Sequence, residues 1–241
     1  MLDPAPNAEL LRSLGRLARG LSALFWGMPA ALIVCIRAAT SEWLAPWMIV
    51  AALALNGLLL FGLWQMGSFQ KQERPWHTAL DRAKLMALIN LGLSPFLFFS
   101  NRVPDQIFFS IAVLILTVSG VLFLLNLNFV LDRLAAMLPD ETLRQETKQF
   151  TALNRWLLLV VLVLLGGTLA VTRLDLHLLD RVNDLVENRV LERTVNIIVL
   201  LLERFGLGLI LIIALLPLSM TMALIWKTKE VILASVFDAR R

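Results

Sequence analysis

Two adjacent charged residues, Glu203 and Arg204, have the positions that most suggest a functional site. They interrupt an apolar run that extends from residue 197 to residue 226. A charge deep in hydrocarbon costs at least about 2.5–3.5 kcal/mol, so a pair buried there would indicate an ion or proton site, or a salt bridge between helices. The alternative, which we favour, is that the apolar span begins at Phe205 and leaves the pair at the outer membrane boundary.

Uncharged polar residues inside the apolar runs form a second group of candidates. Most such residues hydrogen-bond to neighbouring helices, contributing under about 1–2 kcal/mol each, but they can also line the path of a polar ligand. Asn56, Asn90 and Ser94, together with Glu203 and Arg204, are therefore our candidates for a ligand path. The whole group comprises Asn56, Asn90, Ser94, Thr117, Ser119, Asn126 and Asn128.

Three prolines fall near the middle of apolar runs: Pro29, Pro95 and Pro217. Proline removes a backbone hydrogen bond and kinks a helix. Kinked helices occur in transporters whose binding sites lie near the midplane of the membrane, and also in bundles that only pack. We predict a helix kink at each of the three.

The sequence contains no signature of catalysis or metal binding. There is no HExxH, GxSxG, GxxxxGKS/T or CxxC motif, and no pair of acids within an apolar run. The two histidines, His77 and His177, are expected on opposite sides of a membrane, so they cannot share one metal or haem. The single cysteine, Cys35, lies in an apolar run, where a thiol packs as a small hydrophobe. We expect no catalytic residue, no metal and no cofactor.

Composition identifies the elements that must position these residues. Of the 241 residues, 59% are hydrophobic and only 17% are charged, against about 45–50% and about 25% in soluble domains. The net charge of +4 is better explained by basic loops that orient a membrane protein than by nucleic-acid binding, since no basic tract with interleaved aromatics is present. The chain is predicted to be an integral membrane protein.

Six apolar runs are long enough to cross a membrane as helices, because lipid offers no partner for backbone polar groups. We therefore predict an all-α, polytopic six-helix transmembrane bundle with amphipathic interfacial helices, forming one integral-membrane domain over residues 1–241. The first run could instead be a cleavable signal peptide, but it is long for one and its cleavage site would be poor. The predicted spans are 21–38, 43–64, 85–100, 107–130, 156–172 and 205–226.

Basic residues predict the orientation of these spans. With the N-terminus inside, 15 of the 22 Lys and Arg residues fall in cytoplasmic segments and 7 in outer ones. This bias follows the positive-inside rule and places both termini in the cytoplasm, in the cell (inner) membrane. Tryptophans agree, since Trp64, Trp156 and Trp226 fall at inner ends of spans and Trp43 and Trp47 at an outer end.

The segments between the spans have helical patterns of their own. Residues 8–20 and 75–84 read as interfacial helices, with apolar stripes and basic faces. Residues 131–155 predict a helical hairpin that extends the fourth and fifth spans into the cytoplasm, broken at Pro139. Residues 174–204 predict one or two amphipathic helices on the outer membrane surface.

In architecture alone, this arrangement resembles the permease subunits of ABC-2-type exporters. The resemblance rests on six spans, cytoplasmic termini, the interfacial helix at 8–20, the cytoplasmic helix at 75–84 and the outer segment at 174–204. It implies that residues 75–84 would act as the coupling helix that touches an ATPase. The long connection between the fourth and fifth spans departs from that family's pattern, and no residue motif is shared.

Three functions are consistent with these observations. The first is a transport-related, permease-like membrane subunit that acts with a soluble ATPase or with other membrane subunits. The second is a structural or assembly protein that forms homo- or hetero-oligomers in the bilayer. The third is an intramembrane enzyme, which we rank last because the sequence shows no nucleophile–base or metal-ligand spacing.

Overall fold

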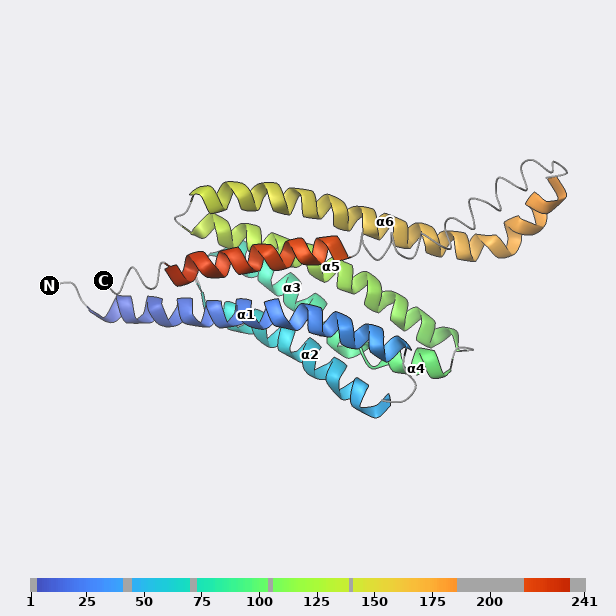
Figure 1. Cartoon of the computed structure of the whole chain (residues 1–241), viewed down its shortest axis with the longest axis horizontal. Coiled ribbons are helices and arrows are strands. Elements are labelled where there is room, and N and C mark those ends of the chain that lie inside the picture. The colour runs from blue at the N-terminus through green and yellow to red at the C-terminus, as the bar shows by residue number, and fades with distance from the viewer. Residues whose placement is uncertain are drawn as a thin grey trace. The chain divides into compact units, whose positions relative to one another are not determined.

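The computed structural model describes residues 4–40, 45–69, 73–103, 106–138, 141–185 and 215–234, and apart from short turns and end residues these are α-helical. Over these ranges the predicted all-α fold is confirmed (Figure 1). The helices are α1 (Pro4–Thr40), α2 (Ala45–Met66), α3 (Arg74–Leu93), α4 (Phe96–Arg102), α5 (Ile107–Met137) and α6 (Glu141–Leu185). A further helix at residues 215–234 is called the C-terminal helix here.

Four helices are long and apolar enough to cross a membrane: Arg12–Ala38, Trp47–Met66, Ile107–Met137 and Arg144–Gly166. They overlap the predicted spans 21–38, 43–64, 107–130 and 156–172, and they indicate an integral membrane protein. The sixth predicted span, 205–226, is described only from residue 215 onward. The count of six spans therefore stays a prediction.

The third predicted span, 85–100, differs most from the structure, because the chain divides there into α3 and α4. Pro95 has no N–H to donate to the carbonyl of Leu91, so the regular helix stops at this point. The hydroxyl of Ser94 donates to that carbonyl instead, at 2.9 Å. Hydroxyl groups commonly satisfy the carbonyl that a proline leaves open.

The other two prolines behave differently from Pro95. Pro29 lies inside α1, which continues through it as one helix. Pro217 lies near the start of the described part of the C-terminal helix, and the residues before 215 lie outside the described ranges. A kink at Pro217 therefore stays a prediction.

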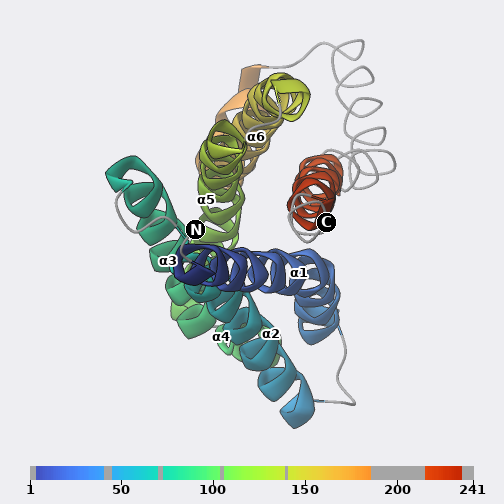
Figure 2. The ribbon, with the colours of Figure 1, turned by 90° about the vertical axis from the view of Figure 1, so that its left-hand side faces the viewer.

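Two compact units make up the chain: Met1–Arg155 with Leu218–Arg241, and Trp156–Pro217. Each is taken by itself. Within the first unit, α1 packs along α2, α3 packs along α5, and α2 also contacts α3 (Figures 1 and 2). The site and the proposals below concern the first unit.

Glycines allow α1 and α2 to approach closely. A Cβ added at Gly20 would meet the carbonyl oxygen of Gly62 at 2.6 Å, and one added at Gly62 would meet the carbonyl oxygen of Gly20 at 3.0 Å. A Cβ at Gly27 would likewise lie 2.8 Å from Leu59. Small residues at helix crossings are the usual means by which membrane helices bring their backbones together.

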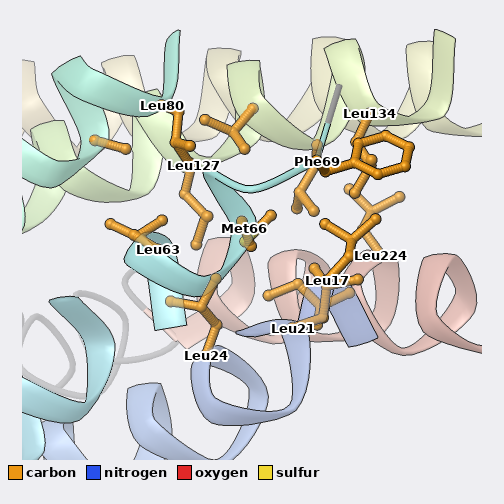
Figure 3. Close-up of a cluster of buried hydrophobic side chains, with 14 of the residues drawn as sticks. Leu17, Leu21, Leu24, Leu63, Met66, Phe69, Leu80, Leu127, Leu134 and Leu224 are labelled. Atoms are coloured by element: carbon orange, nitrogen blue, oxygen red, sulfur yellow. The ribbon is translucent and has the colours of Figure 1, made fainter. Parts of the chain in front are cut away.

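A cluster of buried apolar side chains holds the helices of the first unit together (Figure 3). It contains residues 14–31 of α1, the N-terminal part of α3, the C-terminal parts of α2 and α5, and the C-terminal helix. These are the ends that the charge count assigns to the cytoplasmic side. Labelled members in Figure 3 are Leu17, Leu21, Leu24, Leu63, Met66, Phe69, Leu80, Leu127, Leu134 and Leu224.

This packing changes the interpretation of the two inner interfacial helices. Residues 8–20 are not a separate helix but part of α1, and Leu14 and Leu17 of their apolar stripe are buried in the core. Residues 75–84 open α3, with Pro75 in its first turn, and Trp76 and Leu80 are fully buried. Both apolar stripes therefore pack on protein rather than lying free to rest on lipid.

The remaining connections agree with the sequence in part. The helical hairpin at 131–155 is confirmed, since α5 continues to Met137 and α6 begins at Glu141. Residues 174–185 continue α6 as helix, whereas residues 186–204 lie outside the described ranges. Amphipathic helices on the outer surface stay a prediction.

Candidate functional site

The predicted ligand-path residues do not come together in one place. Asn56 is buried on α2, where its side-chain amide donates to the carbonyl of Ala52 in the same helix at 2.9 Å. Asn90 and Ser94 are buried on α3 and just beyond its end. Glu203 and Arg204 lie outside the described residues.

Asn90 forms a bridge between two helices. Its side-chain oxygen accepts a hydrogen bond from the hydroxyl of Ser119 on α5, and both residues are buried. The contact lies where α3 and α5 pack together. This is the interhelical pairing expected of polar residues in apolar helices, rather than the wall of an open path.

A stronger polar cluster lies elsewhere, formed by Asn128 on α5, Asn154 on α6 and Thr221 on the C-terminal helix. The amide nitrogen of Asn154 donates to the side-chain oxygen of Asn128 and to the hydroxyl of Thr221, both at 2.9 Å. Asn128 in turn donates to Thr221 at 3.3 Å. All three residues are fully buried, so the polar cluster connects three helices without contact with solvent.

Threonines extend this polar cluster along two of its helices. On α6, Thr151 and Thr147 are fully buried one and two turns before Asn154, respectively, and the Thr151 hydroxyl donates to the carbonyl of Thr147 at 2.7 Å. On the C-terminal helix, Thr228 is buried two turns after Thr221. Outside this group of buried polar residues, an ion pair between Glu146 and Lys227 also joins α6 to the C-terminal helix.

The chemistry available to the polar cluster is limited. Its amides and hydroxyls are neutral at ordinary pH, so they can orient helices or a polar ligand but cannot act as a general acid or base. Among the described residues, no three His, Cys, Asp or Glu side chains gather as a metal site would require. We therefore interpret the polar cluster as a structural feature that fixes how α5, α6 and the C-terminal helix pack against one another.

A second feature is an open hollow of about 500 Å³ beside the C-terminal end of α2. Three of the residues around it are basic: Arg16 from α1, and His77 and Lys84 from α3. None is acidic. Asn56, Asn90 and Ser94 do not line it. The remaining lining residues are Phe61, Trp64, Gln65, Gly67 and Ser68.

Only part of the polar cluster is predictable from the sequence. Asn128 was recognised because it interrupts an apolar run, whereas Asn154 lies in a charged segment where an asparagine is unremarkable. A usable signal was the spacing of Thr147, Thr151 and Asn154, which places three small polar residues on one helical face. Thr221 and Thr228 share a face in the same way.

Comparison with known proteins does not assign this arrangement to a family. No protein-family model, no curated protein and no solved structure matches the chain.

Proposed function

We propose that the chain is a transport-related, permease-like membrane subunit that acts with partner proteins. The observation that carries the proposal is a stub of three helices that exceeds what a membrane needs. It consists of the end of α5, residues 141–155 of α6 and the part of the C-terminal helix that follows the predicted span 205–226, and is called the stub below.

The length of α5 supports a position of the stub outside the lipid. α5 has 31 residues, which at about 1.5 Å each gives a helix of about 46 Å against a hydrocarbon core of about 30 Å. Asp132 and Arg133 lie in its last two turns, so the excess belongs at this charged end. Residues 141–155 of α6 carry five further charged side chains.

The stub is cross-linked by polar contacts. The polar cluster joins the same three helices at the base of the stub, and the Glu146–Lys227 ion pair joins two of them within it. Across the turn of the hairpin, the guanidinium of Arg144 donates to the carbonyl of Ala136 at 2.8 Å. A stub that is cross-linked in this way can transmit the movement of a bound partner to the membrane spans.

Two large apolar side chains on α6 are left exposed by the part of the chain that the structure describes. Phe150 is 45% exposed and Leu153 is 56% exposed, among charged neighbours. Exposed apolar groups at a water-facing surface are characteristic of protein–protein contact sites. The partner we propose is a soluble ATPase or another membrane subunit, because the sequence has no nucleotide-binding motif of its own. The stub and both termini would then face the cytoplasm, with the spans in the inner membrane.

Gentle extraction in mild detergent tests the proposal. Wild type should co-purify with an ATPase or a polytopic membrane subunit at fixed stoichiometry, identified by mass spectrometry. The double variant Phe150→Ser/Leu153→Ser should lose that partner, while Gln149→Ser, an exposed neighbour in the same turn, should retain it. Purification of this chain alone, or equal recovery of the partner with both variants, would contradict the proposal.

The alternative is a structural or assembly membrane protein. It is favoured by one observation, namely that Asn128, Asn154 and Thr221 hydrogen-bond to one another. Under this alternative the extracted protein is a homo-oligomer, and substitutions in the polar cluster change stability alone.

A further inference from the structure

The hollow beside the end of α2 combines basic groups with exposed aromatic rings, and the stub does not involve it. Arg16 reaches it from α1, and Lys84 and His77 reach it from α3. Its volume of about 500 Å³ lies in the range of small-molecule sites, about 300–1,000 Å³. Its basic lining favours an anion.

Arg16 and Lys84 are the two strongest cations of the hollow, and together they supply the charge that a phosphate group requires. Lys84 is already oriented by Asp81, whose carboxylate lies 3.1 Å from its ammonium on the exposed side. Gly67 leaves room for the ammonium at the end of α2, since a Cβ there would lie 3.3 Å from Nζ. Within the described ranges Arg16 forms no salt bridge, and its guanidinium can bind a phosphate through two parallel hydrogen bonds.

The aromatic side of the hollow indicates what the phosphate is attached to. Phe61 and Trp64 lie one turn apart in the last part of the candidate span Trp47–Met66. They are 56% and 73% exposed, so their rings are available to lipid chains. A tryptophan at the end of a span belongs at the level of the lipid headgroups, which places the basic groups beside the phosphates of the bilayer.

We propose that this hollow is a binding site for the phosphate of an anionic phospholipid. Arg16 and Lys84 hold the phosphate, Gln65 and His77 contact the polar headgroup, and Phe61 and Trp64 support the acyl chains. Basic pockets between membrane helices bind anionic headgroups on the cytoplasmic side in this way. Because α1, α2 and α3 all contribute, the bound lipid would also bridge three helices.

Lipid titration of the purified protein in mild detergent tests the site, with the number of bound lipids counted by native mass spectrometry. The variant Arg16→Gln/Lys84→Gln should bind dioleoyl phosphatidylglycerol about tenfold more weakly than wild type. The matched control Arg19→Gln/Arg82→Gln removes the same charge from the same helices outside the hollow, and should change the affinity less than about twofold. Equal weakening by the two variants would overturn the proposal, because it would reflect surface charge in general.

Two further arms identify the source of the phosphate. Dioleoyl phosphatidylcholine, which has the same chains but no net charge, should bind at least tenfold more weakly than phosphatidylglycerol. Inorganic phosphate should not displace the lipid at equal concentration. Equal binding of the two lipids, or displacement by inorganic phosphate, would overturn the assignment to an anionic lipid.

A measurement on the wild-type side chains keeps the proposal testable if the double variant fails to fold. Phosphatidylglycerol with brominated chains should quench tryptophan fluorescence, and Trp64→Phe should remove the largest part of that quenching. Trp226→Phe, at the end of a different helix, serves as the control. Quenching that is unchanged by Trp64→Phe would overturn the site.

Discussion

Asn154 makes hydrogen bonds to two other helices from a fully buried position, through Asn128 on α5 and Thr221 on the C-terminal helix. A buried amide surrounded by apolar side chains cannot replace these partners with water. Its hydrogen bonds therefore stabilise one relative position of the three helices, and displaced positions are higher in free energy because the bonds are lost. At the residue scale, this side chain contributes more to specificity than to total stability.

Replacing Asn154 by leucine should destabilise the protein by about 1–2 kcal/mol, because Asn128 and Thr221 each lose a buried partner. Unfolding in sodium dodecyl sulfate, titrated against mild detergent, measures the change. Asn126→Leu is the matched control, since Asn126 on α5 donates to the carbonyl of Leu122 in its own helix, at 2.7 Å. A loss for Asn126→Leu as large as for Asn154→Leu would contradict this account of the polar cluster.

How far the sequence predicts these residues depends on their surroundings. Asn90 and Asn128 stand out because apolar neighbours make an amide conspicuous. Asn154 is adjacent to Arg155 and follows a charged segment, so only its partners on α5 and the C-terminal helix reveal its role. The two hydrogen bonds of Asn154 join residues that are 26 and 67 positions apart in the sequence. Such contacts depend on how the helices pack, which the hydropathy of the sequence does not encode.

Gly20 and Gly62 determine, at the scale of elements, how closely α1 and α2 pack. Each glycine faces the backbone carbonyl of the other, and a backbone atom cannot move aside as the end of a flexible side chain can. In lipid, where the hydrophobic effect between helices is weak, such close contact supplies much of the association energy.

Gly62→Leu should therefore separate α1 from α2 and cost about 1–3 kcal/mol or more, as over-packing does. Gly57→Leu is the control on the same helix, because a Cβ at Gly57 meets nothing within 4 Å. The Gly57 variant should retain wild-type stability, or gain slightly from the better helix propensity of leucine. The midpoint of thermal aggregation in detergent distinguishes them, and equal midpoints for the two variants would refute the close-packing argument.

Element boundaries show where hydropathy succeeds and where it fails. The hairpin from α5 to α6 was predictable because Pro139 and the acids after it give clear local signals. The predicted span at 85–100 is divided into α3 and α4 at Pro95, one of the three positions where a kink was predicted, because Pro95 ends the regular hydrogen bonding even though apolar residues continue beyond it. Residues 8–20 and 75–84 were assigned to the membrane surface, since an apolar stripe does not reveal whether lipid or protein covers it.

In the first unit, the buried apolar core lies toward one end of the helices, which is called the packed end here. Its buried core gathers the ends of helices that carry most of the basic residues, whereas large apolar side chains such as Trp47, Val50 and Ile111 are exposed toward the other ends. Exposed apolar side chains suit lipid, and a tight leucine core is most useful where the alternative is water. We infer that the packed end lies at the cytoplasmic surface of the bilayer and carries the stub.

Cysteine labelling tests this central claim most directly, because Cys35 is the only cysteine and Cys35→Ala gives a clean background. Single cysteines are introduced as Gln149→Cys on the stub, Gln106→Cys at the opposite end of α5, and Val163→Cys in the apolar part of α6. A membrane-impermeant maleimide is applied to intact cells and to inverted vesicles. The account predicts labelling of Gln106→Cys only in intact cells, of Gln149→Cys only in inverted vesicles, and of Val163→Cys in neither. Labelling of Gln149→Cys in intact cells, or of Val163→Cys from either side, would contradict it.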